Sequence, residues 1–448
     1  MKKSGYIIIG IILVAVLGYG AYSYFQPTAP AATQNDWITD QKSLDELPEV
    51  TPSPVVSTTT GTTTPAASPT STPIKKLPEK ILIPAQSATP ANISSDPFIQ
   101  QGRQLLTQGK YAEARDAFSQ AAPSATATYY QGLIASYFGE RAPSVTALTA
   151  LKTMPDADAK LLENGQKILD SYTLFDTYQD GRQEFLAALI SKQFLSIGEV
   201  DLAIGKLEYI LNKVPDYTDV STLLGSAYLV KGNYERAITV LTNSLPNDRP
   251  EVYYWLGIAH LYQQSYNKAI GAFQLALNKG YQPAFKPHEK IADTYLSLNN
   301  FAQAAAAYES ALQTADGQDY IDLYVRPVWV YIDKLRQPSD ALRLANQAVL
   351  RFPRSAMAHN LLGWSQVAAG NYADAKVALD RAVALDPTLA AIYLNLGSYY
   401  RAQNDLAGAI NAYQSAVQYD KQGSIANAAR NILKSLETLQ PTPSPASN

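Results

Sequence analysis

The stretch LLGSAYLVKGNYERAITVL at residues 223–241 decides the fold of this chain, and it returns in modified form as LLGWSQVAAGNYADAKVAL at residues 361–379. In both copies a Leu-Gly pair is followed by an alanine twelve residues after the glycine, and Gly-Asn-Tyr stands between the two. Gly257 and Gly397 begin further copies, 32 residues after Gly225 and 34 after Gly363. The chain therefore contains an internal repeat with a period near 34 residues.

Each repeat has the apolar pattern of two helices joined by a short turn. Apolar residues recur at spacings of three and four throughout residues 97–440, and no segment shows the alternation typical of strands. The turns are short breaks such as Lys231-Gly232-Asn233. Small residues at the repeated glycine and alanine positions let the two helices approach closely. One pair cannot bury its apolar face alone, so we expect stacked pairs that share a core and wind into a superhelix.

Paired helices at this period resemble the tetratricopeptide repeat. Further copies lie around Gly109, Gly198 and Asn299, and Trp329 stands where another copy requires a small residue. The resemblance implies an all-α fold, a superhelical solenoid of eight or nine helix–turn–helix repeats. Its parts would be a first repeat followed by a degenerate helical region at residues 97–182, and the main array with a C-terminal cap helix at residues 183–440.

The N-terminal residues 1–26 have the pattern of a transmembrane signal anchor. Lys2 and Lys3 precede an uncharged run, Ser4 to Phe25, which is long enough as a helix to span the ~30 Å hydrocarbon layer. Acidic residues follow the run, so we expect the repeats to lie outside the cytoplasm at the cell membrane. The alternative is a signal peptide that is cleaved near residues 29–32.

Residues 27–96 have the composition of a disordered linker. Threonine, serine and proline supply 18 of the 23 positions from Thr51 to Pro73. Such a stretch cannot bury enough apolar surface to offset its chain entropy. We expect a stalk or a spacer here, and a frayed tail of similar composition at residues 441–448.

Composition and motifs point away from catalysis and nucleic-acid binding. The formal net charge is −3, from 36 basic and 39 acidic residues, and there is no cysteine. No phosphate-binding glycine loop or nucleophile elbow occurs, and His288-Glu289 lacks the second histidine of a zinc-protease motif, since Ala292 holds that place. We therefore expect no enzyme, no cofactor, no metal site and no nucleic-acid partner.

The resemblance implies that the first helix of each repeat lines a concave groove, where a partner would bind. Aromatic residues at these positions would be the strongest anchors, with packing between repeats as the competing interpretation. The mixture of residue types does not match the Lys, Arg and Asn cluster with which some family members hold a C-terminal carboxylate. The candidate partner-binding residues are Tyr254, Tyr262, Lys286, Glu289, Arg326, Asn360, Trp364 and Arg401.

The sequence thus predicts a membrane-anchored scaffold, from a bacterial source, that holds a partner protein or peptide in its groove. Two alternatives stay open at this point. The repeats could self-associate as a structural component of the envelope, or a cleaved and secreted form could act as a soluble adaptor or chaperone.

Overall fold

The computed structural model describes residues 95–178, 181–315, 320–421 and 423–437. The anchor expected at residues 1–26, nearly all of the linker at 27–96 and the tail at 441–448 lie outside these ranges. Within them, no helix combines the length and the apolar character needed to cross a membrane.

The described residues form α-helices joined by short turns, without strands, and this confirms the expected all-α solenoid. The N-terminal half contains α2 (Pro97–Thr107), α3 (Tyr111–Gln120), α4 (Ala125–Phe138), α5 (Arg141–Ala150), α6 (Ala159–Tyr178), α7 (Gln183–Ser196), α8 (Val200–Lys213), α9 (Thr218–Val230), α10 (Tyr234–Asn243), α11 (Pro250–Tyr262) and α12 (Tyr266–Asn278). The C-terminal half contains α13 (Phe285–Ser297), α14 (Phe301–Thr314), α15 (Asp322–Trp329), α16 (Pro338–Arg351), α17 (Ala356–Ala368), α18 (Tyr372–Leu385), α19 (Ala390–Ala402), α20 (Leu406–Asp420) and α21 (Ser424–Glu437).

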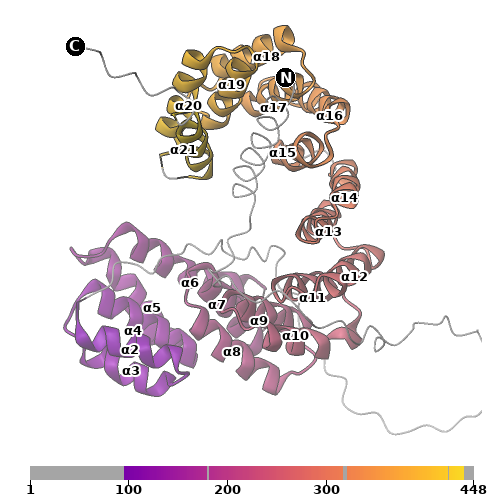
Figure 1. Ribbon diagram of the computed structural model, residues 1–448. Coiled ribbons are helices and arrows are strands. Elements are labelled where there is room, and N and C mark those ends of the chain that lie inside the picture. Colours follow the sequence, from indigo (N-terminus) through magenta and orange to yellow (C-terminus); the bar gives the residue numbers. More distant parts are fainter. Residues whose placement is uncertain (1–94, 179–180, 316–319, 422, 438–448) are drawn as a thin grey trace, which may run out of the picture.

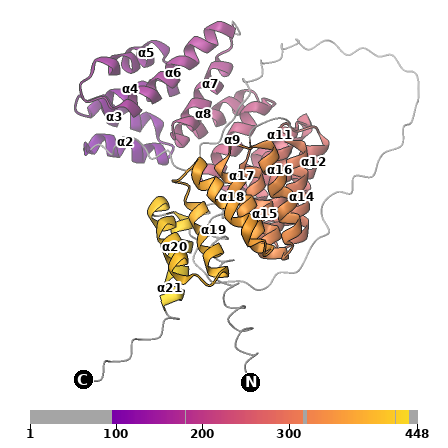
Figure 2. The ribbon, with the colours of Figure 1, turned by 90° about the horizontal axis from the view of Figure 1, so that it is seen from above.

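The helices stack in order along a curved path. Helices α2–α12 form one arm of an arc, α13–α15 form its side, and α16–α21 form the other arm (Figure 1). The second view shows that the path also rises out of the plane, as a superhelix does (Figure 2). From α7 onward the helices pair as first and second members of a repeat, and the first members, α11, α13, α15, α17 and α19, lie on the inner side of the arc (Figure 1).

The turn inside each pair has one recurring conformation. Gly232 and Gly370 adopt φ angles of 72° and 78°, which glycine reaches without strain. Asn299 and Asn404 take the same left-handed conformation in other repeats, with φ of 57° and 60°. The turn geometry therefore belongs to the repeat, and glycine is its favoured but not its required residue.

Close approach of the two helices explains the repeated glycine. A Cβ atom added at Gly257 of α11 would lie 2.5 Å from the ring of Phe273 in α12, and one at Gly397 would lie 2.4 Å from Tyr413. The bulky residue follows the glycine by sixteen positions in each case. The same spacing and contact occur at four more pairs, namely Gly102–Phe118, Gly132–Leu148, Gly225–Leu241 and Gly363–Leu379.

Region 128–182 departs from the regular array through one unpaired helix. Helices α4 and α5 form a pair with the Gly132–Leu148 contact, although Pro143 and Pro155 disturb the sequence pattern there. The 20-residue helix α6 follows alone and packs on α4, α5 and α7.

Beyond the unpaired helix, α3 and α4 contact α8 through long-range hydrogen bonds. The Tyr111 hydroxyl of α3 donates to the Asp201 carbonyl oxygen at 3.0 Å, and the Lys206 Nζ of α8 donates to the Tyr137 carbonyl oxygen at 2.5 Å. The Tyr130 hydroxyl lies 3.3 Å from Glu199 Oε1. Helices α3 and α4 are thus fixed to a helix some 70 to 90 residues further along the chain.

Helix α21 is the last helix that the structure describes. One face packs on α20 through Ile425, Ala429, Ile432 and Leu436, all buried. The opposite face is exposed and polar, and it carries Asn427, Arg430, Asn431 and Lys434.

Candidate functional site

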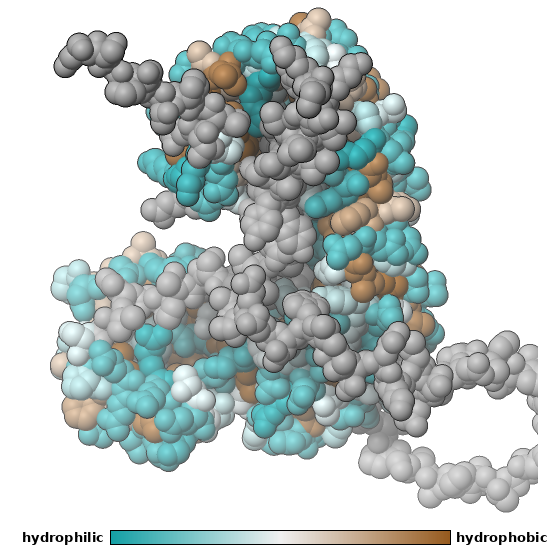
Figure 3. Space-filling view, viewed as in Figure 1, coloured by the Kyte–Doolittle hydropathy of each residue, from teal (hydrophilic) through white to brown (hydrophobic). Residues whose placement is uncertain are grey.

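The candidate site is the inner face of the arc, by which we mean the sides of α11, α13, α15, α17 and α19 that face the hollow between the two arms. The space-filling view shows an open gap between the two arms (Figure 3). The first helices contact one another directly along this face, since α11 packs on α13, α15 on α17 and α17 on α19. Between α13 and α15 the ion pair of Arg326 with Asp293 makes the connection, so the face runs through all five helices.

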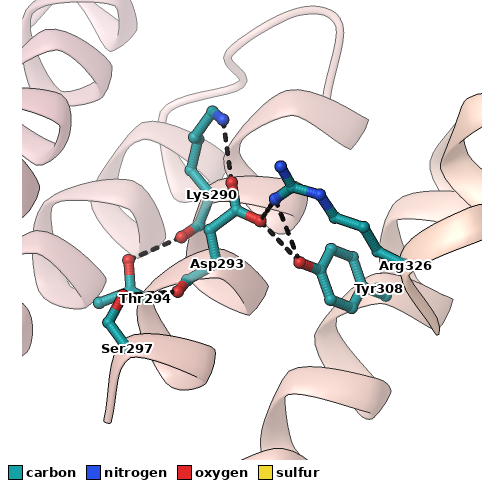
Figure 4. A network of polar contacts seen from close by, with 6 residues as sticks. All are labelled: Lys290, Asp293, Thr294, Ser297, Tyr308 and Arg326. Carbon is teal, nitrogen blue, oxygen red and sulfur yellow. Dashed lines mark hydrogen bonds and ion pairs between the residues drawn. The ribbon is translucent and has the colours of Figure 1, made fainter. Parts of the chain in front are cut away.

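A charged cluster joins three helices at the middle of this face. Lys290 and Asp293 come from α13, Tyr308 from α14 and Arg326 from α15, and all converge on the Asp293 carboxylate (Figure 4). Lys290 Nζ donates to Asp293 Oδ2 at 3.0 Å, and the Tyr308 hydroxyl donates to Oδ1 at 2.6 Å. Arg326 forms an ion pair with Oδ1. We call these four residues the Asp293 cluster.

The backbone around the cluster is supported as well. Thr294 Oγ1 donates to the Lys290 carbonyl oxygen at 2.7 Å, and Ser297 Oγ donates to the Asp293 carbonyl oxygen at 3.1 Å (Figure 4). These bonds satisfy the side-chain hydroxyls on the helix itself and leave the Asp293 carboxylate to its cationic partners.

Electrostatics keep the cluster ionised. Burial acts to raise the pKa of Asp293, but Lys290 and Arg326 outweigh it, so this pKa lies below its usual range. Asp293 in turn holds the pKa of Lys290 above normal. Burial raises the pKa of the neighbouring Glu289, and Lys290 offsets only part of this effect. Three cations, Lys286, Lys290 and Arg326, thus lie near two carboxylates. Asp293 is ionised and held in ion pairs, and Glu289 has a raised pKa.

The structure brings four of the predicted residues together around this cluster. Arg326 is a member, while Lys286 and Glu289 lie on the same face of α13, close enough for Lys286 to act against the rise in the pKa of Glu289. Tyr254 lies near Lys290 and Glu289, but its ring is buried and stacks on Tyr281 at a centroid distance of 4.5 Å. Burial raises the pKa of Tyr254 to about 12.

Tyr262 remains partly accessible, with 37% of its surface exposed. Its other face stacks on Tyr234 at 5.7 Å. Equivalent tyrosine contacts join the start of a second helix to the end of the next first helix in other repeats, at Tyr111–Tyr137 and Tyr372–Tyr399. Tyr262 therefore has a packing role, whatever it contacts in a partner.

The remaining three predicted residues lie further along the arc. Asn360 of α17 is buried, and its Oδ1 accepts a hydrogen bond from Asn395 Nδ2 of α19 at 2.9 Å. Trp364 packs at the edge of the core around α17, and Arg401 of α19 lies near Tyr413. They do not join the Asp293 cluster, and their contact with a partner stays a prediction, as it does for the other five.

Sequence reasoning missed the partners that these residues have inside the chain. Asn395 lies 35 positions after Asn360, close to one repeat period, so the period itself was a signal for this bridge. Lys290 and Tyr308 carried no such signal, because the cluster depends on side chains of three helices meeting at one carboxylate.

The histidines do not form a site. His260, His288 and His359 lie in α11, α13 and α17, and His359 Nε2 is 3.0 Å from the Pro353 carbonyl oxygen. In the part of the chain that the structure describes, no three metal-ligating side chains of His, Cys, Asp or Glu gather in one place.

Fold and site together define a class, that of helical-repeat proteins with a continuous inner face. Models of the tetratricopeptide repeat match residues 222–284, 287–316, 333–388 and 360–425. The chain therefore carries tetratricopeptide repeats, which generally mediate protein–protein interaction and are typically found in non-enzymatic scaffolds. No curated protein matches the sequence.

Several solved structures are similar. The protein YrrB, described as a TPR protein with an unusual peptide-binding site, is 19% identical with a TM-score of 0.32, over 42% of this chain and 97% of that chain. A tetratricopeptide repeat protein from Parabacteroides merdae is 15% identical with a TM-score of 0.38, over 59% and 98%. The APC/C hetero-tetramer Cut9–Hcn1 is 13% identical with a TM-score of 0.39, over 77% and 76%. These similarities say nothing about partner or activity.

Proposed function

We propose that this chain is a membrane-anchored scaffold that binds a partner protein or peptide on the inner face of its repeat array. The observation that carries the proposal is the Asp293 cluster with its surroundings, where Lys286, Arg326 and the exposed side of Tyr262 stand on adjacent repeats. Such a mixture of cations and aromatic rings suits a polypeptide segment that offers both carboxylates and apolar side chains. The anchor at residues 1–26 would place the array outside the cytoplasm and fix where capture occurs.

A pull-down with the full chain, solubilised in detergent and tagged at its C-terminus, tests the proposal. The groove variant combines Lys286→Glu, Tyr262→Ala and Trp364→Ala, and it leaves Tyr254 intact because that ring is buried in the core. The control variant is Leu350→Ala in α16, a side chain that is 82% exposed on a second helix. We expect the parent and the control to capture the same partner from source membranes, and the groove variant to lose it with unchanged helicity by circular dichroism.

Retention of the partner by the groove variant would contradict the proposal. Recovery of the bait alone, with sedimentation showing a stable oligomer, would favour the self-assembling alternative. The mass of the intact mature chain separates the anchored form from a cleaved, secreted adaptor, because only the anchored form keeps residues 1–26.

A further inference from the structure

The inner face near the Asp293 cluster has more positive than negative charge available to a ligand. The Asp293 carboxylate is already bonded to Lys290, Arg326 and Tyr308, so it offers little charge to the outside. Lys290 and Arg326 nevertheless keep 29% and 23% of their side chains exposed, against 10% for Asp293. Lys286 adds a further cation on the same helix face. A ligand at this place meets three cations, Lys286, Lys290 and Arg326, against the half-buried carboxylate of Glu289 and the ion-paired carboxylate of Asp293.

Apolar and cationic groups follow one another along the adjacent edge, where the first helices end. Tyr262 at the end of α11 is 37% exposed, and Leu298, directly after α13, is 40% exposed. Lys334, near the end of the next first helix, lies 5.1 Å above the Trp329 ring. The surface therefore fits an acidic segment that also carries apolar side chains.

The chain itself contains one segment of this chemistry. Residues 36–49, DWITDQKSLDELPE, hold five carboxylates against the single Lys42, a net charge of −4. They account for five of the six acidic residues that precede residue 96. Trp37, Ile38, Leu44 and Leu47 supply the apolar part, and the Thr/Ser/Pro-rich stretch that follows offers neither.

We propose that the inner face around α13 and α15 takes up residues 36–49 of the same chain, so that the scaffold carries an internal occupant in its own groove. This inference rests on the proposed function and names the chemical class of ligand for the same face. A partner from outside would then bind by displacing the segment, and an acidic segment with aromatic and aliphatic residues is the class of partner that competes best.

Tether length permits this contact. Residues 50–96 separate the segment from the first described helix, and a coil of that length has a root-mean-square span of about 35–40 Å and a fully extended reach of about 150–170 Å. A tether of this kind gives an effective concentration on the order of 1 mM. An intrinsic dissociation constant of about 0.1 mM would therefore keep roughly nine chains in ten occupied.

Because the chain has no cysteine, a pair of introduced cysteines tests the contact cleanly. Ser43→Cys in the segment is combined with Ser297→Cys at the end of α13. The control pair places the second cysteine at Ser310 in α14, a serine whose hydroxyl donates to its own helix backbone just as that of Ser297 does. Both full-length proteins, in detergent, are treated with a short bifunctional maleimide, and mass spectrometry of the tryptic peptides quantifies the cross-link.

We expect at least fivefold more cross-link for the 43–297 pair than for the 43–310 pair, with a yield that does not change on dilution. Neutralising the segment by Asp40→Asn, Asp45→Asn and Glu46→Gln should bring the yield down to the control level without touching the folded array. Equal yields for the two pairs, or an undiminished yield after neutralisation, would overturn the inference. A cross-link that disappears on dilution would assign the face to a second copy of the chain and would also overturn it.

The two proposals fail separately. If the cross-link is absent but the groove variant still loses an external partner, the scaffold function stands without an internal occupant. If the cross-link forms but no external partner depends on the inner face, the groove holds only its own chain and the scaffold function falls.

Discussion

At the scale of single residues, the repeat depends on contacts between one small and one bulky side chain. Gly257 meets the Phe273 ring so closely that a methyl group would overlap it, whereas Gly271, in the middle of α12, has no atom within 4 Å of an added Cβ. These two glycines, fourteen positions apart, thus differ in their surroundings: only Gly257 has no room for a side chain.

We expect Gly257→Ala to destabilise the array by about 1–3 kcal/mol, because the new methyl group must push the Phe273 ring out of a packed core. Gly271→Ala is the matched control and should stabilise by about 0.5–1 kcal/mol, since alanine is the better helix former at an open position. Urea unfolding followed by circular dichroism measures both. A loss of stability in the control as large as in Gly257→Ala would contradict this account.

Trp329 shows how one repeat tolerates the reverse arrangement. A bulky residue holds the small position there, and sixteen residues later the chain has the small Ala345 where other repeats have Phe, Leu or Tyr. Both side chains are buried in one core cluster. The bulky side chain, Trp329, is on the first helix and the small one, Ala345, is on the second, so the pair fills a similar volume of the core.

We expect Trp329→Ala to cost about 3–5 kcal/mol through the cavity that it leaves. Adding Ala345→Leu should recover more than 1 kcal/mol in that background, although the same change in the parent protein overpacks the core and should destabilise it. A double-mutant cycle of unfolding free energies measures the coupling. Additive effects would show that the two positions do not share one space.

The repeat could be predicted from the sequence because its small residues keep their identity, Gly and Ala at a fixed spacing of twelve. The contact at a spacing of sixteen was hidden, since its bulky member changes between Phe273, Leu241 and Tyr413. Gly132, in the second helix pair, carried no such signal, because Ser144 stands twelve residues after it, whereas Gly102 in the first pair has Ala114 at that spacing. The packing requires a bulky side chain at a given distance from the glycine, and Phe, Leu and Tyr all meet this requirement. A single sequence shows the residue type but not this shared requirement.

At the scale of elements, the Asp293 cluster connects α13, α14 and α15 through one carboxylate. Helix α15 needs this support because Pro327 lies within it and a π-helical stretch, Val330–Leu335, continues it. Proline removes a backbone donor, so part of the helix ladder is missing where Arg326 reaches across to α13.

Asp293→Asn should lower stability by about 3 kcal/mol at pH 7, because it leaves Lys290 and Arg326 facing each other without a counter-charge. The exposed Asp322→Asn in α15 serves as the control and should have little effect. The pKa of Asp293 is lower in the folded protein than in the unfolded chain, so the parent holds this stability above about pH 4 and loses it as the pH falls further. The difference in unfolding free energy between parent and variant should therefore be smaller at pH 3 than at pH 7. An equal difference at the two pH values would contradict the account.

The elements of the site were only partly open to prediction. Helix periodicity placed Lys286, Glu289 and Arg326 on first helices, where the structure has them. It did not reveal that Asn360 and Tyr254 are covered by neighbouring repeats. Which side chains are covered depends on the curvature of the stack, and this curvature cannot be predicted from the sequence of one repeat.

At the scale of the whole molecule, α3 and α4 contact α8, which lies some 70 to 90 residues further along the chain. Two ionisable groups lie at this contact, the half-buried Glu199 and the buried Lys206. Burial raises the pKa of Glu199 to about 7, with Arg103 and the Tyr130 hydroxyl opposing the shift, and burial lowers the pKa of Lys206 to about 8. Both groups therefore change protonation state near neutral pH.

Glu199→Gln should stabilise the protein at pH 8 relative to pH 5. The folded state raises the pKa of Glu199 above its unfolded value of about 4.5, so the parent loses stability as the pH rises from there to about 7 and is level above it. The amide cannot ionise, and its advantage should reach roughly 1–3 kcal/mol at pH 8. Urea midpoints at pH 5, 6, 7 and 8 measure this, and a pH-independent difference would contradict it.

The polar outer face of α21 has a consequence for how the protein responds to its partner. Head-to-tail association of repeat arrays needs an apolar surface at both ends, and the outer face of α21 is polar and exposed to solvent. For the proposed scaffold, we therefore expect the amount of bound partner to rise in proportion to the number of chains, with ordinary saturation and no threshold concentration.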